Sequence, residues 1–386
     1  MSAGAFEQEE CEVGIYQSLG VRPLINARGT ISYLGGSLPH PEVMERMVEA
    51  SRSFVNTYEL ERAVGERLAE LTHNEAAFVA VSAAAGLLLA AAAVMANNDE
   101  AKRARLPDTC GMKDEAIALA VNKNPYHHCV KSAGMKVRWV GDPAQPTVEE
   151  LDAAIGPATA CCLYFVNDEL HGKQLGLPDV VAVCHRHGVP VIVDAAAQIP
   201  PFENTWKFTR EMGADLAVFS GGKGFRGPQS SGLVVGTRAM IENIMFFCPP
   251  IHSVARPAKA SRELIIGLLT AVEIMSRRSA DTIFAEYETR LQTIDEQLEG
   301  IPGLALRKHF GTDVGKPFHH LRLHVDEQVA GFTSQQLLVA LDNGEPRIVV
   351  GELANGELMI NAEMLNPGEE YIVAGRVAQI FRRGGR

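Results

Sequence analysis

Short apolar runs alternate with longer, helix-like stretches from about residue 75 onward. Six runs have the length and composition of buried strands, and they lie at 76–82, 135–141, 159–166, 189–196, 214–220 and 231–236. Continuous apolar runs joined by helical segments are typical of a mostly parallel sheet that is covered on both faces. The pattern therefore predicts an α/β domain.

The pattern changes at about residue 261. Residues 261–278 and 284–300 predict long amphipathic helices, the second of which ends at a glycine. Strand-like alternation then follows at 304–310, 319–325 and 346–353. We therefore predict three parts, namely an N-terminal arm at 1–50, a large α/β domain at 51–260 and a smaller C-terminal α+β domain at 261–386.

The run at 76–96 contains 21 residues without a charge, which is long enough to cross a bilayer. Alanine dominates it, Ser82 and Gly86 interrupt it, and no basic cluster flanks it. A short strand, a tight turn and a buried helix explain these features better. We therefore expect no membrane segment.

Charge and cysteine content narrow the classes of partner. The chain has 386 residues and a net charge of −11, which argues against a nucleic-acid partner. Its seven cysteines include no Cys-x-x-Cys pair, so we expect neither a disulfide framework nor a metal site. The first ten residues are acidic and lack the apolar core of a secretory signal. Free thiols without such a signal indicate a cytoplasmic protein.

Lys223 lies between glycines, just after one strand-like run and just before another. The spacing Gly222-x-Gly224-x-x-Gly227 has the form of a dinucleotide fingerprint, but that fingerprint must open a helix. Here Pro228 and a strand-like run follow. A phosphate-binding P-loop is excluded as well, because a glycine rather than Ser or Thr follows the lysine.

Asp194 ends one predicted parallel strand, and Lys223 follows the next one. Ligands of open α/β sheets bind outside the carboxyl ends of the strands, so both side chains should reach one pocket. Pyridoxal phosphate requires such a pair. The lysine amine condenses with its aldehyde, and the carboxylate keeps its ring nitrogen protonated. Taken singly, Lys223 could be a surface lysine and Asp194 a helix cap, but their order along the chain favours the cofactor.

The phosphate of this cofactor also needs a site. Residues 82–86 follow the first predicted strand and open the alanine-rich helix. The N–H groups and the dipole of a helix N-terminus attract phosphate. Ser220, three residues before the lysine, could add a hydroxyl group.

Six blocks of the sequence now carry a resemblance to a known family, and they lie at 24–39, 54–72, 81–90, 193–201, 220–236 and 256–273. The most specific is SGGKGFRGPQSSG at the start of 220–236. The chain resembles fold-type I pyridoxal phosphate enzymes, and within them the family of selenocysteine synthase and D-glucosaminate-6-phosphate ammonia-lyase. The resemblance implies the aspartate aminotransferase fold, in which a mostly parallel seven-stranded sheet is joined to a smaller α+β domain. It also implies a homodimer or a larger assembly.

The resemblance implies roles for individual residues. Lys223 would be the Schiff-base lysine and Asp194 the partner of the ring nitrogen. The phosphate would be held by Ala84, Ala85, Gly86 and Ser220. His128, or its neighbour His127, would stack on the cofactor, with Asn167 and Gln198 near the phenolic oxygen and the ring edge. A substrate carboxylate or phosphate would meet cations drawn from Arg28, Arg226, Arg256, Lys259 and Arg347.

The reaction expected is loss of ammonia from a small hydroxylated amino acid or amino sugar acid, catalysed by a lyase or dehydratase. Only a short arm precedes the predicted large domain, and the chain is acidic, so selenium transfer on tRNA is disfavoured. A racemase or epimerase and an aldolase would share every residue named so far. A non-catalytic protein of the same fold is disfavoured by the presence of both Lys223 and Asp194.

Overall fold

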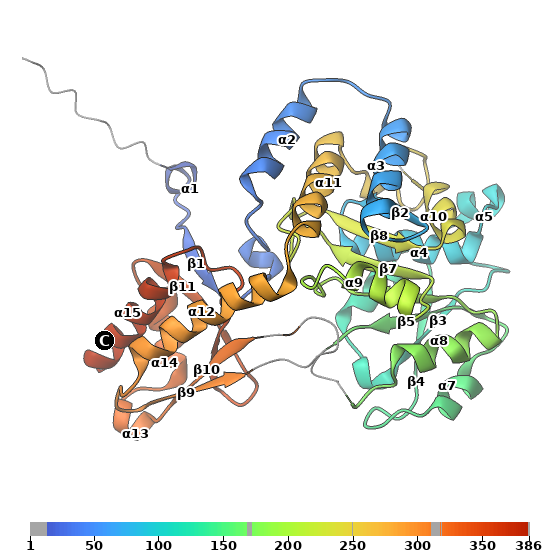
Figure 1. Cartoon of the computed structure of the whole chain (residues 1–386). Coiled ribbons are helices and arrows are strands. Elements are labelled where there is room, and N and C mark those ends of the chain that lie inside the picture. Colours follow the sequence, from blue (N-terminus) through green and yellow to red (C-terminus); the bar gives the residue numbers. More distant parts are fainter. Residues whose placement is uncertain (1–13, 168–171, 249, 310–316, 318, 385–386) are drawn as a thin grey trace, which may run out of the picture. The chain divides into compact units, whose positions relative to one another are not determined.

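The computed structural model describes residues 14–167, 172–248, 250–309, 317 and 319–384. The chain forms two compact units (Figure 1). The large unit comprises Thr30–Tyr287 and Phe310–His319. The small unit comprises Met1–Gly29, Glu288–His309 and His320–Arg386.

The large unit is built on a seven-stranded sheet with the strand order β2-β8-β7-β6-β5-β3-β4. In chain order the strands are β2 (Ala76–Ala80), β3 (Glu115–Leu119), β4 (Lys136–Val140), β5 (Thr159–Phe165), β6 (Val191–Asp194), β7 (Leu216–Ser220) and β8 (Gly232–Gly236). Strand β8 runs antiparallel to β2 and β7, and the other neighbours are parallel. The predicted fold class is confirmed, and each of the six predicted runs contains one strand.

The remaining strand, β3, is absent from the sequence-based prediction. It consists of Glu, Ala, Ile, Ala and Leu, so only Ile117 is β-branched and the composition favours a helix. The strand nevertheless pairs with β5 on one side and β4 on the other, and its last four residues are buried. Tertiary packing therefore overrides the local preference.

Helices cover both faces of this sheet (Figure 1). The α-helices are α2 (Pro41–Ser51), α3 (Thr57–Leu71), α4 (Ala83–Ala96), α5 (Glu100–Arg105), α6 (His128–Lys131), α7 (Val148–Ala154), α8 (Leu177–Arg186), α9 (Asn204–Trp206), α10 (Arg238–Met245) and α11 (Arg262–Ser276). The 3₁₀ helices are η1 (Ser32–Leu34), η2 (Ala120–Asn122), η3 (Pro125–His127) and η6 (Arg256–Ala258), and η5 (Lys207–Glu211) is a π-helix. In β6, Val191 and Val193 face the core on one side and Ile192 the core on the other, as the alternation of a strand requires.

Helix α4 accounts for most of the uncharged run at 76–96. Strand β2 and α4 are separated by a turn at Ser82, as the sequence predicts. Gly86 lets the helix lie close to the sheet, because a Cβ atom there would come within 2.9 Å of side-chain atoms of Val218 and Val234. In the described part of the chain, no helix is long and apolar enough to span a membrane.

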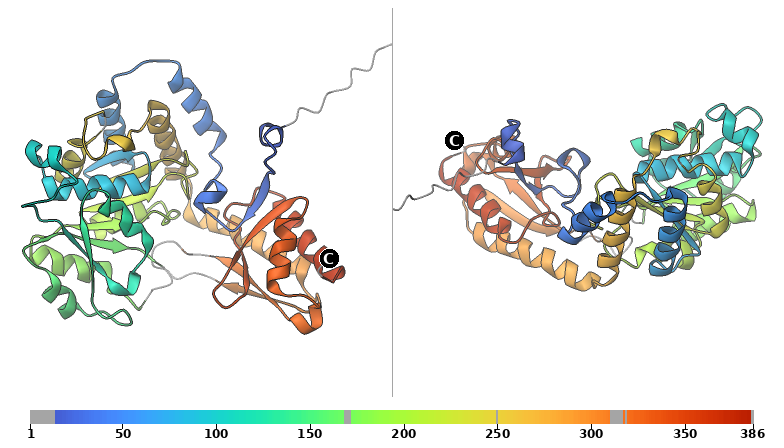
Figure 2. Two further views of the ribbon diagram at one scale, coloured as in Figure 1. Left: turned by 180° about the vertical axis from the view of Figure 1, so that it is seen from behind. Right: turned by 90° about the horizontal axis from the view of Figure 1, so that it is seen from above.

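The small unit contains a five-stranded sheet with the order β1-β11-β12-β10-β9. Its strands are β1 (Leu24–Ala27), β9 (Leu304–His309), β10 (His320–Val325), β11 (Arg347–Glu352) and β12 (Leu358–Ile360). Its helices are α1 (Ile15–Ser18), α13 (Glu327–Ala330), α14 (Ser334–Asp342) and α15 (Glu369–Arg382), and α12 (Ala280–Leu298) contributes residues to both units. The C-terminal helices, drawn in orange to red in Figure 2, lie beside this sheet, and α14 packs on β11.

The boundaries between the two units differ from the predicted boundaries of the arm and the domains. Strand β1 pairs in parallel with β11, which assigns the first part of the predicted arm to the small unit. Helix α2 packs against α11, which keeps the rest of the arm, and α11 with it, in the large unit. The predicted boundaries at residues 50 and 260 rest on changes of sequence pattern, which do not reveal such long-range pairings.

Candidate active site

A cavity of about 220 Å³ lies at the carboxyl ends of β6 and β7 in the large unit. It is also bounded by the start of α4, by the segment around η3 and α6, and by residues 30–36. The lining residues are Thr30, Ser32, Gly36, Ser82, Ala83, Ala84, Leu87, Tyr126, Cys129, Asp194, Ala196, Ser220, Gly222, Lys223, Gln229 and Ser230. The structure thus brings Asp194 and Lys223 to one cavity.

Asp194 is the last residue of β6, and the neighbouring strands hold it from both sides. It is in register with Phe165 of β5 and Val218 of β7. The Ala196 N–H donates a hydrogen bond of 3.1 Å to its Oδ1. Burial raises the pKa of this carboxyl group, whereas the Ala196 N–H and the charge of Lys223 lower it. A cation in the cavity would therefore favour the ionised carboxylate.

Lys223 lies in the turn between β7 and β8. The strands close this turn, because Ser220 pairs with Gly232 and the Gly221 N–H donates to the Ser231 carbonyl at 2.8 Å. Inside the turn, the Arg226 N–H donates to the Lys223 carbonyl at 2.9 Å. The lysine thus lies on a well-bonded turn.

The two glycines beside Lys223 have no room for a side chain. A Cβ atom on Gly222 would lie 2.3 Å from the Gln229 Cα, and one on Gly224 would lie 1.9 Å from the Ile199 carbonyl oxygen. These neighbours are backbone atoms, which cannot move without moving the turn. Close packing of the protein backbone therefore demands glycine at both positions.

The N-terminus of α4 forms another wall of the cavity. Ser82 caps the helix, and its Oγ accepts a hydrogen bond of 3.0 Å from the Ala85 N–H. Ala83 and Ala84 are the first two helical residues, whose N–H groups have no partner within an α-helix. Both residues line the cavity. Small side chains and the positive end of the helix dipole make this wall suitable for an anion.

The predicted phosphate-binding residues fall into two groups. Ala84 and Ser220 line the cavity. Ala85 and Gly86 are not among the lining residues, because the Ala85 N–H is taken by Ser82 and Gly86 packs against the sheet. Ser82 and Ala83 line the cavity as well, and phosphate binding by any of these residues stays a prediction.

The two predicted stacking histidines also lie outside the cavity lining. The rings of His127 and His128 are tilted against each other with centroids 4.4 Å apart, and His127 meets Trp139 edge-on at 5.5 Å. The cavity is lined instead by Tyr126 and Cys129, which flank this pair in the sequence. Burial and the charge of Asp194 raise the pKa of the Cys129 thiol. The predicted segment reaches the cavity through Tyr126 and Cys129, and stacking by His127 or His128 stays a prediction.

Asn167 and Gln198 are not among the lining residues either. Asn167 is half-buried just beyond β5. Gln198 is buried, its N–H donates to the Ala195 carbonyl at 2.9 Å, and its own carbonyl accepts from the Asn204 side chain at 2.7 Å. Gln198 therefore helps to order the segment that follows Asp194.

The predicted substrate-binding arginines have structural contacts. Arg226 adopts a left-handed backbone conformation (φ 53°), and its Nε donates to the Leu38 carbonyl at 3.1 Å. Arg28 and Arg347 belong to the small unit, where the Arg28 N–H donates to Asn26 and Arg347 pairs with Asp342 at 2.8 Å. A role for any of these cations in substrate binding stays a prediction.

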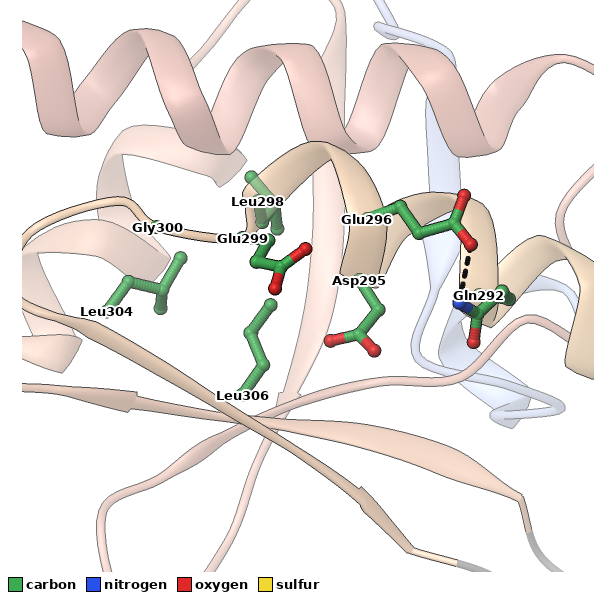
Figure 3. Close-up of a pocket in the computed structure, with 8 residues that line it drawn as sticks. All are labelled: Gln292, Asp295, Glu296, Leu298, Glu299, Gly300, Leu304 and Leu306. Carbon is green, nitrogen blue, oxygen red and sulfur yellow. Dashed lines mark hydrogen bonds between the residues drawn. The ribbon is translucent and has the colours of Figure 1, made fainter.

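A second cavity, of about 370 Å³, lies in the small unit between the end of α12 and β9 (Figure 3). Asp295 and Glu296 reach it from the helix, Glu299 from the turn that follows, and Leu304 and Leu306 from the strand. Asp295 pairs with Lys308 at 3.1 Å. In the described ranges, no group of three or more His, Cys, Asp or Glu side chains could hold a metal ion. The cavity with Lys223 is the better candidate for an active site, because it brings together Lys223, Asp194 and the N-terminus of α4.

Three curated proteins illustrate what the chain is similar to. It is 30% identical to D-glucosaminate-6-phosphate ammonia lyase of Salmonella typhimurium, over 95% of this chain and 97% of that protein. It is also 30% identical to 5'-C-glycyluridine monooxygenase-decarboxylase of a Streptomyces species, over 96% of this chain and 93% of that protein. Identity to L-seryl-tRNA(Sec) selenium transferase of Desulfomicrobium baculatum is 24%, over 99% and 88%.

A solved structure and a family pattern agree with these relatives. The structure of a D-glucosaminate-6-phosphate ammonia-lyase aligns with a TM-score of 0.82 at 27% identity, covering 97% of this chain and all of that one. The sequence pattern of class-V aminotransferases matches residues 40–315. The predicted resemblance is confirmed. The match includes Asp194, Lys223 and the start of α4, and the chain belongs to the aminotransferase class-V family.

Proposed function

We propose that the protein is a pyridoxal phosphate-dependent lyase that releases ammonia from a small hydroxylated amino acid or amino sugar acid. The observation that carries this proposal is a single cavity lined by Asp194, Lys223 and the N-terminus of α4. Membership of the aminotransferase class-V family and similarity to an ammonia-lyase over nearly the whole chain support it.

The residues of the cavity fit the chemical groups of the cofactor. The amine of Lys223 suits its aldehyde, and the N–H groups of Ala83 and Ala84 suit its phosphate. Asp194 suits the protonated ring nitrogen, because the burial that raises its pKa is offset when a cation lies beside it. When bound, pyridoxal phosphate accepts the electron pair that remains on carbon after a proton is removed.

Each side chain of the cavity has its own role in the proposed reaction. Lys223 Nζ would hold the cofactor, and its amine would accept the α-proton of the substrate as a general base. The Asp194 carboxylate keeps the ring nitrogen protonated. Tyr126 lies at the cavity and offers a ring that can cover the cofactor. For a substrate with a β-hydroxyl group, loss of that group as water and hydrolysis at the α-carbon give a 2-keto acid and ammonia.

The name of one relative supports an amino sugar acid that carries a phosphate as the substrate. The other relative of equal identity supports a second candidate, in which an amino acid is decarboxylated with consumption of oxygen. Racemisation, epimerisation and aldol cleavage need the same lysine and carboxylate. These activities differ in what they release, so product analysis separates them.

A homodimer is the assembly that we infer. Helices α2 and α3 and their connection expose several large apolar side chains, namely Met44, Val48, Phe54, Val55 and Tyr58. Phe54 alone is 97% exposed. A second copy of the chain would remove this apolar surface from water.

We also infer a reducing, cytoplasmic location, because the structure leaves Cys110, Cys129, Cys161, Cys162, Cys184 and Cys248 without disulfides.

The experiment that tests the function uses the purified protein loaded with pyridoxal phosphate. D-Glucosaminate 6-phosphate, D-glucosaminate and a panel of D- and L-hydroxyamino acids are each incubated in deuterated water, and ammonia, 2-keto acid, CO₂ and oxygen uptake are measured. Ammonia and keto acid in equal amounts support the lyase. Oxygen uptake with CO₂ supports the second candidate, and deuterium at the α-carbon without either product supports a racemase. A protein that binds no pyridoxal phosphate would refute the proposal.

A further inference from the structure

The large unit contains another cavity, of about 500 Å³, between α3, α10 and the start of β2. It shares no lining residue with the cavity that contains Lys223. Its walls include apolar groups of Ala69, Ile241 and Met245. The proposed reaction uses none of these residues.

Glu61 of α3 lines this cavity and is only 6% exposed. Its Oε2 is buried and has no hydrogen-bond partner. A buried carboxyl group without a partner costs free energy, because it loses the hydrogen bonds of water and gains none. Glu61 is therefore the feature of this cavity that the folded chain leaves unsatisfied.

The charges around Glu61 are mainly negative. The charged side chains at the cavity are Glu66 and Glu70 of α3, Glu75 before β2, Glu242 of α10, and the two cations Arg62 and Arg238. Arg238 is already bonded to Glu75, since its backbone N–H and its Nη2 donate to that residue at 3.0 and 2.8 Å. The buried Cys248, just after α10, adds a thiol whose pKa burial and the charge of Glu61 raise to about 12. A positively charged ligand would be attracted here.

We propose that this cavity binds a small organic cation whose ammonium group pairs with Glu61. The ammonium group supplies the donor that Glu61 Oε2 lacks, and an alkyl group can lie on the apolar wall. An organic cation suits the site better than a metal ion, because the described residues contain no group of three side chains that could ligate a metal. The volume is also within the range of small-molecule sites.

Binding at this site is coupled to proton release. Burial raises the pKa of Glu61 from 4.5 to about 8, so the empty site holds a proton at neutral pH. A cation favours the ionised form, and the proton must leave when the cation binds. Affinity should therefore rise with pH and level off above pH 8. The weakening from pH 8.5 to pH 6.5 should be about 20-fold if one such group controls binding.

The test is calorimetric titration of the full chain, loaded with pyridoxal phosphate, with N,N-dimethylbutylamine. A tertiary amine cannot condense with the cofactor aldehyde, so the heat of binding contains no contribution from Schiff-base formation. Titrations at pH 6.5, 7.0 and 8.5, each in two buffers with different ionisation enthalpies, give both affinity and protons released. We expect nearly one proton per site at pH 7.0, far fewer at pH 8.5, and no binding of the uncharged analogue N,N-dimethylbutanamide.

Two variants assign the effect to Glu61. Glu61→Gln keeps the shape of the side chain but should weaken binding at least tenfold and abolish proton release. Glu149→Gln removes an exposed charge of α7, outside this cavity, and should keep the affinity, the pH dependence and the proton release. Equal binding by wild type and Glu61→Gln would overturn the proposal. If Glu61→Gln does not fold, the wild type decides, because binding without proton release at pH 7.0 overturns it as well.

Discussion

Asp194 and Lys223 line the same cavity, and the charge of Lys223 lowers the pKa of the Asp194 carboxyl group against the opposing effect of burial. Asp194 ends β6, and Lys223 lies in the turn that follows β7, the neighbouring parallel strand, which is in register with β6 where Asp194 meets Val218. The pair thus links the fold of the sheet to the chemistry proposed for it.

This relationship predicts a response in the protein without cofactor. Lys223→Ala removes the cation, so only the Ala196 N–H then opposes the effect of burial and the pKa of Asp194 should rise. Carbon NMR titration of the labelled aspartate carboxyl groups measures it. Lys131→Ala removes an exposed cation of the same unit and should leave the Asp194 pKa unchanged. An equal Asp194 pKa in wild type and Lys223→Ala would show that the two groups do not interact.

Lys223→Ala should also abolish covalent attachment of the cofactor. The visible absorbance of the lysine-bound cofactor should disappear, and turnover should fall by roughly a thousandfold or more, because the variant lacks both the anchor and the general base. Absorbance spectra and ammonia release measure the two effects. Retention of the wild-type spectrum in this variant would assign the anchor to another residue.

Gly222→Ala should disturb the turn that carries Lys223. The new Cβ would lie 2.3 Å from the Gln229 Cα, so the backbone must shift. Such overpacking typically costs about 1–3 kcal/mol in free energy of unfolding, and the displaced lysine should bind the cofactor more weakly. Urea denaturation and cofactor titration measure these effects. Gly375→Ala in α15 meets no atom within 4 Å and should leave stability unchanged or slightly higher.

Glu61 predicts how stability depends on pH. Its folded-state pKa of about 8 lies above the unfolded value of 4.5, so between these values the folded chain holds a proton that the unfolded chain has lost. The contribution of Glu61 therefore becomes less favourable as pH rises through this window, by an amount on the order of 4–5 kcal/mol at most. Thermal unfolding of Glu61→Gln should show a smaller loss of stability from pH 5 to pH 8 than the wild type. Parallel curves for the two proteins would contradict a raised pKa.

Phe54 predicts the strength of self-association. Its side chain is 97% exposed and its ring lies 5.5 Å from the Arg262 guanidinium carbon. If helices α2 and α3 meet a second copy, Phe54→Ser should weaken the dimer by about 30-fold, the effect of losing one strong interface contact. Sedimentation equilibrium measures it. Val339→Ser, at an exposed apolar position of the small unit, is the matched control and should leave association unchanged.

The sequence predicted most of the large sheet because its strands are rich in aromatic or β-branched residues. Each of the other six strands contains an aromatic residue or at least two β-branched residues, whereas β3 contains no aromatic residue and only one β-branched residue, Ile117. The sequence also did not reveal which strands pair over long distances along the chain. The four residues of β1 look like part of an arm until their partner, β11, is known.

The candidate site shows the same limit at the level of single residues. Asp194, Lys223, Ala84 and Ser220 were predictable because strand ends and a helix start fix where they lie. Tyr126 and Cys129 were not, since η3 and α6 are too short to give a periodic signal that separates the side chains facing the cavity from His127 and His128. The sequence did not show that Gly86 packs on Val218 and Val234, because this contact depends on distant parts of the chain.

The turn that carries Lys223 is closed by the hairpin from which it emerges, through the pairing of Ser220 with Gly232. Neither end of this loop depends on a ligand for its anchorage. The reactive amine should consequently be in position before any vitamin-derived molecule arrives. An emptied protein could then be reloaded with synthetic analogues of its coenzyme under native conditions, without a cycle of unfolding and renaturation.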